Sequence, residues 1–247
     1  MDSLTQIVLG AAVGEVVMGR KLGNRAMVWG AVSGTIPDLD IVAYAFMEEI
    51  EALAVHRGLS HSFFFAALYP WIIGWFTHNV YRSDIYRKPW FRWLGLSIGI
   101  LIFGIIGLVF NFIVSTIQGE INYYVIAMTV ILGTLFFYRV YQRQKKGVIN
   151  GSGVSYMDWV KLHFWAVFTH PLLDSCTTYG TQLFQPFWDY RVAFNNVSVV
   201  DPAYTVPFLT FLIVASLIPR GNIWRKSMNW AGIAISSAYL LWSVNNK

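Results

Sequence analysis

Charged residues are scarce in this sequence. Asp, Glu, Lys and Arg make up 13% of its 247 residues, while 56% are hydrophobic and the mean hydropathy is +0.50. An ordinary soluble domain carries roughly 25% charged residues, so the composition indicates an integral membrane protein. At about 20 residues per membrane span, the chain has room for several spans and little else. We therefore expect a single integral membrane domain over residues 1–247.

Cysteine is also nearly absent. Cys176 is the single cysteine, which excludes an intrachain disulfide framework, a Cys-based zinc motif and a thioredoxin-like pair. The opening residues Met1, Asp2 and Ser3 lack the positive charge that begins a secretory signal peptide. We expect the apolar stretch that follows them to stay in the protein as part of the bundle.

Long apolar runs account for most of the chain. Five of them are predicted to be membrane spans, at residues 63–80, 93–114, 123–141, 206–218 and 228–244. Three shorter and more polar helices, expected to pack inside the bundle, are predicted at residues 4–18, 27–36 and 156–170. The predicted fold class is all-α, a polytopic transmembrane helical bundle of about eight helices that include short or partly buried ones.

Small residues mark the first two of the shorter helices. Gly10 and Gly14 lie in one, and Gly30 and Gly34 in the other. Small side chains let two helix backbones approach closely. We expect these two helices to pack against each other across a turn at residues 21–24.

Lysine and arginine gather in loops between the apolar runs. The clusters are separated by even numbers of predicted spans, so they all fall on one side of the membrane. Their members are Arg20, Lys21 and Arg25; Arg82, Arg87, Lys88 and Arg92; Arg139, Arg143, Lys145 and Lys146; and Arg220, Arg225 and Lys226. Cytoplasmic loops carry the excess of basic residues. We expect a multi-pass protein of the cell inner (plasma) membrane with these loops in the cytoplasm, and no nucleic-acid partner.

The first acidic motif is Pro37-Asp38-Leu39-Asp40, at the end of a predicted helix. On a continued helix the two carboxylates would point about 200° apart, but in a turn both can converge on one cation. Carboxylates at membrane depth need a partner. The alternative is a solvated helix end with an Asp cap.

A histidine motif, His56-Arg57-Gly58-Leu59-Ser60-His61-Ser62, follows. On an ideal helix its histidines would point about 140° apart, so a shared ligand role requires the bend that Gly58 permits. Imidazole is the commonest metal ligand, and the Arg57 guanidinium suits a phosphate or carboxylate. The alternative is a pair of interfacial histidines with hydrogen-bonded neighbours.

The segment His170-Pro171-Leu172-Leu173-Asp174 places an imidazole and a carboxylate on one face if the helix continues through the proline. Pro171 could instead start a new helix. In either case the pair supports metal ligation, or a histidine oriented by a carboxylate. A buried hydrogen-bonded pair without a metal is the alternative reading.

Further polar residues are less distinctive. Asp201 follows a long polar and aromatic loop and could be a ligand, a general base or a helix N-cap. His78 and His163 are predicted to be structural. Glu15 lies within a predicted helix, away from Asp38, and is a secondary candidate for the site.

These motifs together resemble the YdjM-like family of membrane-bound, metal-dependent hydrolases found in bacteria and archaea. The resemblance covers most of the chain and also includes Met1-Asp2-Ser3-Leu4-Thr5-Gln6, Thr178-Tyr179-Gly180 and Asp201-Pro202-Ala203-Tyr204. Many members carry histidine where this sequence has Gln6. The resemblance implies metal-dependent hydrolysis in a membrane.

The sequence therefore predicts a metal-dependent hydrolase whose site lies on the non-cytoplasmic face. The predicted ligands of one or two divalent cations are Asp38, Asp40, His56, His61, His170 and Asp174. Zinc is the first expectation, with manganese or iron as alternatives. Arg57 is predicted to hold an anionic oxygen and Asp201 to accept a proton.

A membrane phospholipid or a lipid-linked phosphate is the predicted substrate and partner. Two other functions remain open. The first is an ion- or proton-coupled transporter, which predicts polar residues through the whole bundle. The second is a membrane scaffold with a structural metal, which predicts a closed coordination shell.

Overall fold

The computed structural model describes residues 1–48, 56–145 and 153–246 of the chain. Regular secondary structure in these residues is helical throughout, and two isolated β-bridges, Thr177 with Val197 and Thr181 with Val192, join parts of the loop after α7. The elements are α1 (Ser3–Leu22), α2 (Asn24–Thr35), η1 (Pro37–Ala45), η2 (Leu59–His61), α4 (Phe63–Arg82), η3 (Ile85–Arg87), α5 (Pro89–Gln118), α6 (Tyr123–Lys145), α7 (Tyr156–Ser175), α8 (Pro202–Leu217) and α9 (Ile223–Asn245). The all-α prediction is confirmed for the described residues.

Two compact units make up the chain. The first contains residues 1–78 and 153–247, and the second contains residues 79–152. The helix α4 runs across the boundary. The prediction of one integral membrane domain stays a prediction.

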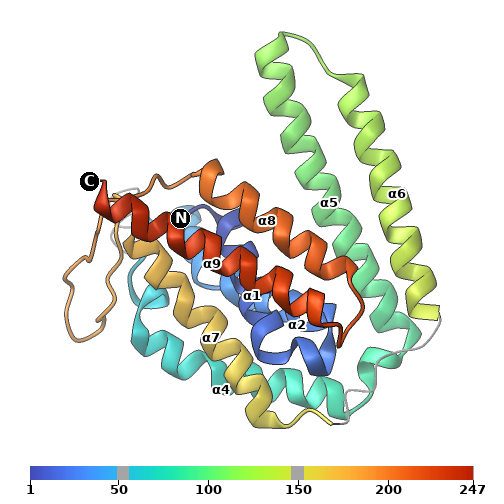
Figure 1. Ribbon diagram of the computed structural model, residues 1–247, viewed down its shortest axis with the longest axis horizontal. Coiled ribbons are helices and arrows are strands. Elements are labelled where there is room, and N and C mark those ends of the chain that lie inside the picture. Colours follow the sequence, from blue (N-terminus) through green and yellow to red (C-terminus); the bar gives the residue numbers. More distant parts are fainter. Residues whose placement is uncertain (49–55, 146–152, 247) are drawn as a thin grey trace. The chain divides into compact units, whose positions relative to one another are not determined.

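Helix α1 is the central element of the first unit. It packs against α2, α7, α8 and α9, which surround it in Figure 1. Its buried Val8, Ala11 and Ala12 join a core with Phe208 of α8 and Leu173 of α7. Leu4, Ile7 and Val16 of α1 are exposed, but a polar side chain on its buried faces must find a partner within the protein.

The predicted close packing of the first two helices is confirmed. A Cβ atom added to Gly10 would lie 2.4 Å from the carbonyl oxygen of Gly30, and one added to Gly14 would lie 2.1 Å from that of Ala26. The two helices are joined at Gly23, whose φ of 60° falls in the left-handed region that glycine adopts without strain. The glycines therefore bring the end of α2 against α1 and α7.

The second unit contains the α5–α6 hairpin, drawn in green in Figure 1. Gly119, with φ of 79°, ends α5, and the side-chain amide of Asn111 donates to the carbonyl oxygen of Asn122 at 2.7 Å. Phe103 and Phe137 pack edge to face between the two helices. Both predicted helices, at 93–114 and 123–141, are present, but α5 runs from Pro89 to Gln118, and Pro89 at its first position favours helix initiation.

One helix in the described residues is both long and apolar enough to cross a membrane, at Tyr123–Gln142 with a mean hydropathy of 1.6. The segment Pro202–Leu217 is apolar but shorter. Several spans were predicted, so the polytopic arrangement stays a prediction. Large apolar side chains are nevertheless exposed on other helices, among them Ile72 and Trp75 of α4 and Leu241 of α9. Such surfaces are typical of contact with lipid or with another protein.

Candidate metal centre

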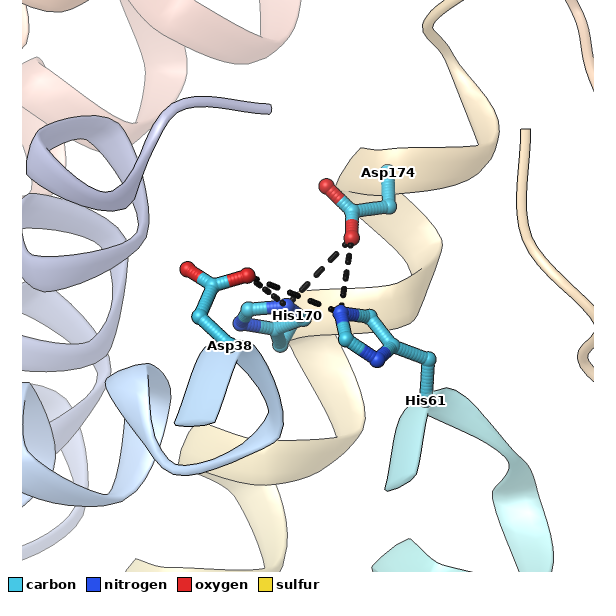
Figure 2. A group of neighbouring side chains, drawn as sticks. All are labelled: Asp38, His61, His170 and Asp174. Carbon is cyan, nitrogen blue, oxygen red and sulfur yellow. Dashed lines mark ion pairs between the residues drawn. The ribbon is translucent and has the colours of Figure 1, made fainter. Parts of the chain in front are cut away.

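Four side chains from three separate segments meet at one end of the first unit (Figure 2). Asp38 comes from η1, His61 from η2, and His170 and Asp174 from successive turns of α7. Helix α7 continues through Pro171, which settles the alternative that the sequence left open. Because the last two residues are four apart in a continuous helix, their side chains lie on one face.

The atoms of this group are spaced as ligands of one cation would be. The Nε2 atoms of His61 and His170 each lie 3.3 Å from Asp174 Oδ2, and they lie 3.6 and 3.4 Å from Asp38 Oδ1. All four atoms fall within 4.8 Å of one another. With zinc-ligand bonds of about 2.1 Å, the atoms of a tetrahedral shell lie about 3.4 Å apart. The donor set therefore fits a divalent cation.

Three of these four atoms are buried and lack a hydrogen-bond partner in the described chain: His61 Nε2, His170 Nε2 and Asp174 Oδ2. Buried polar atoms are rarely left unpaired, because desolvation without a partner costs roughly 1–3 kcal/mol for each group. A cation between the four residues would satisfy all three atoms at once.

Both histidines are oriented through their other ring nitrogen. His170 Nδ1 lies 2.5 Å from the carbonyl oxygen of Gly34, one of the free carbonyls at the end of α2. A carbonyl can only accept, so Nδ1 carries the proton and Nε2 presents its lone pair to the group. His61 Nδ1 lies 3.2 Å from Asp40 Oδ2, which favours the same tautomer. Metal-binding histidines are commonly held in this way.

Asp40 and His56, both predicted ligands, lie one layer outside the group of four. Asp40 faces His61 Nδ1, and its other oxygen lies 2.7 Å from His56 Nδ1. It also accepts hydrogen bonds from the Arg57 backbone N–H at 3.0 Å and the Ser60 hydroxyl at 2.8 Å. The geometry makes Asp40 a positioning residue for the loop that carries His61.

The sequence model described as YdjM inner membrane protein matches residues 1–114 and 123–247. The chain belongs to the YdjM inner membrane protein family. Nothing among curated proteins and nothing among solved structures matches it. Membership of the YdjM family supports the predicted membrane localisation; the sidedness of the loops stays a prediction.

Arg57 lies beside the group in this YdjM family member; its predicted catalytic role stays a prediction. Its Nε atom is 3.7 Å from Asp174 Oδ2, and its Nη1 atom donates to the Thr177 hydroxyl at 3.0 Å. The guanidinium stacks over the Tyr179 ring at 4.8 Å from the centroid. The buried Nε atom has no hydrogen-bond partner in the described chain. A cation with a free donor next to the group is suited to an anionic ligand.

Gln6 is a site residue that the sequence left undecided. Its side-chain amide donates to Asp174 Oδ1 at 3.0 Å and to the His170 carbonyl oxygen at 3.2 Å. The α-amino group of Met1 contacts the same oxygen of Asp174. These donors occupy Oδ1 and leave Oδ2 facing the histidines. The motif at the start of the chain was the only sequence signal for this role.

Carboxylates set the protonation of the site. Burial alone would lower the pKa of His61, but Asp174, Asp38 and Asp40 raise it to about 10. Burial alone would raise the pKa values of Asp38 and Asp40, yet the neighbouring histidines hold both below the ordinary range. The two aspartates are therefore ionised, and they favour a positive charge on His61. Binding of a divalent cation would displace the proton from its Nε2 atom.

Three other candidates are held elsewhere. Asp201 is the N-cap of α8, one of the roles that the sequence left open, and its oxygens accept from the Tyr204 backbone N–H and the Tyr239 hydroxyl; a role as general base stays a prediction. His163 lies between the Ser33 and Thr77 hydroxyls, at 2.5 and 3.1 Å. Glu15 pairs with Arg225, at the other end of α1. None of the three contacts the group of four through an interaction recorded in the described residues.

Proposed function

We propose that this YdjM family protein is a membrane-bound, metal-dependent hydrolase that acts on a phospholipid or a lipid-linked phosphate. The observation that carries the proposal is the convergence of Asp38, His61, His170 and Asp174, with three buried ligand atoms that no other group in the described residues satisfies. Mixed nitrogen and oxygen ligands suit zinc first, and manganese or iron next.

A cation bound there would polarise the scissile group and lower the pKa of a water molecule. The residues around the cation would bind the substrate and orient the ligands. Arg57 would hold an anionic oxygen of the substrate through its unused Nε–H, while Asp40 keeps His61 in its ligand tautomer. Asp38 is the member of the group with the most exposed side chain, at 14%, so substrate would approach from its side.

The loop after α7 supports a lipid substrate. Phe187, Trp188, Tyr190 and Phe194 are 82, 60, 58 and 56% exposed. Aromatic side chains of this kind concentrate at the membrane interface, where their rings sit among the headgroups. The same loop reaches the site, because its Gly180 carbonyl oxygen accepts from Arg57 Nη1 at 3.4 Å. A headgroup bound under this loop would meet Arg57.

The partial exposure of the group favours catalysis over a structural metal, because a catalytic site keeps a position open. One observation favours the transporter alternative, which predicts polar residues through the whole bundle. His163 and the Glu15–Arg225 pair are buried polar residues at two further depths along the bundle. Metal-dependent flux across proteoliposomes without lipid hydrolysis would select that alternative.

Metal analysis of the purified, full-length protein tests the ligand assignment. His61→Ala and Asp174→Ala should each lose most of the bound metal, because each removes a ligand from the group. His78→Ala is the matched control, since His78 packs edge to face against Tyr156 and is no member of the group. Circular dichroism establishes that the variants fold. Full metal content in both ligand variants would refute the assignment.

Hydrolysis is tested separately with a lipid screen. The wild-type protein should release headgroup or phosphate from a lipid in detergent micelles, and a chelator should abolish the release. Arg57→Lys keeps the positive charge but loses the planar fork of donors, so it should retain metal and lose activity. A protein that binds metal yet releases nothing from any phosphate-containing lipid would refute the hydrolase and leave the metal centre intact.

A further inference from the structure

A pocket lined by several charged residues lies at the other end of α1 from the candidate metal centre. It has a volume of about 360 Å³ and lies between the C-terminal end of α1 and the N-terminal end of α9. Its lining includes Glu15, Arg20, Arg225, Lys226 and Asn229. Arg20 is fourteen residues beyond Gln6, which corresponds to about 21 Å along the helix. The pocket is therefore separate from the metal centre.

A buried ion pair forms one wall of this pocket. Arg225 Nε donates to Glu15 Oε1 at 2.6 Å, and Nη2 donates to Glu15 Oε2 at 2.5 Å. Nη1 donates to Asn24 Oδ1 at 2.7 Å and to the Ile218 carbonyl oxygen at 3.0 Å. Glu15 balances the charge of Arg225, and the hydrogen-bond donors of Arg225 are already engaged by these partners. This wall is preorganised and adds no net charge.

Two further basic residues give the pocket its charge. Arg20 and Lys226 line it and are exposed, and the structure records no ion pair for either within the described residues. The pocket also meets the N-terminus of α9 at Asn222 and Ile223, where the helix dipole favours an anion. Since Arg225 is neutralised, the surplus of positive charge comes from Arg20, Lys226 and this helix end.

One buried side-chain atom lining the pocket lacks a partner. Asn229 is 2% exposed; its Nδ2 atom donates to the Ala12 carbonyl oxygen at 3.0 Å, but its Oδ1 atom accepts no hydrogen bond from the described chain. A buried acceptor of this kind needs a donor. The pocket thus combines positive charge with an unsatisfied acceptor, so its ligand must carry both an anion and a hydrogen-bond donor.

We infer that the pocket binds the headgroup of an acidic glycerophospholipid, with Arg20 and Lys226 holding the phosphodiester and Asn229 Oδ1 accepting a hydrogen bond from a glycerol hydroxyl. A zwitterionic headgroup gains less from the positive surplus, and a phosphate without a hydroxyl leaves Asn229 unpaired. Trp224 and Trp230 are exposed at the same end of α9, as expected where a helix meets the headgroup layer. Basic pockets between membrane helices are typical sites for acidic lipids.

Native mass spectrometry of the full chain in detergent measures this binding. The probes are phosphatidylglycerol, phosphatidylmethanol, which has the same charge but no hydroxyl, and phosphatidylcholine. We expect phosphatidylglycerol to bind most tightly. The double variant Arg20→Gln/Lys226→Gln should weaken both acidic lipids by roughly 30-fold, since each basic residue contributes about 1 kcal/mol. Unchanged binding of phosphatidylglycerol to this variant overturns the inference.

Two controls separate this pocket from general electrostatic attraction. Arg82→Gln/Lys88→Gln removes the same charge from exposed positions elsewhere and should leave lipid binding unchanged. Asn229→Leu should reduce phosphatidylglycerol binding to the level of phosphatidylmethanol and leave phosphatidylmethanol binding as it was, which also shows that the variant is folded. Equal losses in the two double variants, or wild-type discrimination in Asn229→Leu, would overturn the inference.

Competition with soluble glycerol 3-phosphate distinguishes the source of the ligand. If it displaces the lipid from the wild-type protein, the pocket recognises the headgroup alone. If the lipid stays bound, its acyl chains contribute to the affinity. Both results support the pocket, provided that the Arg20→Gln/Lys226→Gln variant has lost the lipid.

Discussion

The Asp40→Asn substitution tests whether a residue beside the metal centre positions a ligand or is itself one. Asp40 Oδ2 takes three contacts, from Arg57 N–H at 3.0 Å, from the Ser60 hydroxyl at 2.8 Å and from His61 Nδ1 at 3.2 Å. Asparagine keeps one acceptor oxygen, which can serve these three donors. Its amide nitrogen would then face His56 Nδ1 in place of a carboxylate oxygen. His61 keeps an acceptor but loses the negative charge.

The loss of this negative charge should weaken metal binding. Removing an outer partner of a metal ligand typically lowers metal affinity about 10- to 100-fold, equivalent to about 1.4–2.7 kcal/mol. The stoichiometry should not change, because Asp38, His61, His170 and Asp174 all remain. Asp38→Asn, in contrast, removes an anionic ligand and should abolish stoichiometric binding.

Competition between the protein and a chromophoric zinc chelator gives the affinity, and elemental analysis gives the stoichiometry. Asp201→Asn is the matched control, because Asp201 caps α8 and accepts from Tyr239 outside the group. If Asp40→Asn loses metal as completely as Asp38→Asn, Asp40 is a ligand, as the sequence predicted. If its affinity equals that of the wild type, the positioning role is wrong.

Two further substitutions test the packing that supports the site. Gly30→Ala should lower the free energy of unfolding by about 1–3 kcal/mol, because its Cβ would lie 2.2 Å from the Gly10 carbonyl oxygen. Thermal unfolding in detergent measures this change. Gly95→Ala is the control: an added Cβ there meets open space, so this variant should keep the stability of the wild type. Glu15→Gln should cost about 3–5 kcal/mol by leaving the buried Arg225 cation uncompensated, and a chemical-denaturation midpoint equal to that of the wild type would contradict this expectation.

Local patterns in the sequence predicted much of the fold. The apolar run at 123–141 corresponds to α6, and the small residues of the first two helices correspond to their close contact. Helix ends were less predictable. Arg92 belongs to the basic cluster that precedes the predicted span, yet Pro89 starts α5 three residues before it. Hydropathy marks the buried part of a helix, whereas its ends depend on local hydrogen bonding.

The site could be predicted as a set of motifs but not as a set of contacts. His170 and Asp174 were predictable as neighbours if α7 continued, because i and i+4 positions share a face. Both Asp38 and Asp40 were predicted as ligands, since both follow Pro37 in a turn. Only the position of His61 distinguishes the two: its Nε2 faces Asp38 and its Nδ1 faces Asp40.

Sequence patterns do not predict contacts between distant residues, and the pairing of Glu15 was missed for this reason. Its partner Arg225 is 210 residues away, and no periodicity relates the two. Helix geometry nevertheless restricts which neighbouring helix can supply the partner of Glu15. Glu15 is nine residues beyond Gln6, so the two side chains point about 180° apart and lie about 13 Å apart along α1. Gln6 meets α7 and Glu15 meets α9, as opposite faces of a central helix require. Because each buried polar group of α1 needs its own neighbour, this one helix contacts the candidate metal centre at one end and a charged pocket at the other.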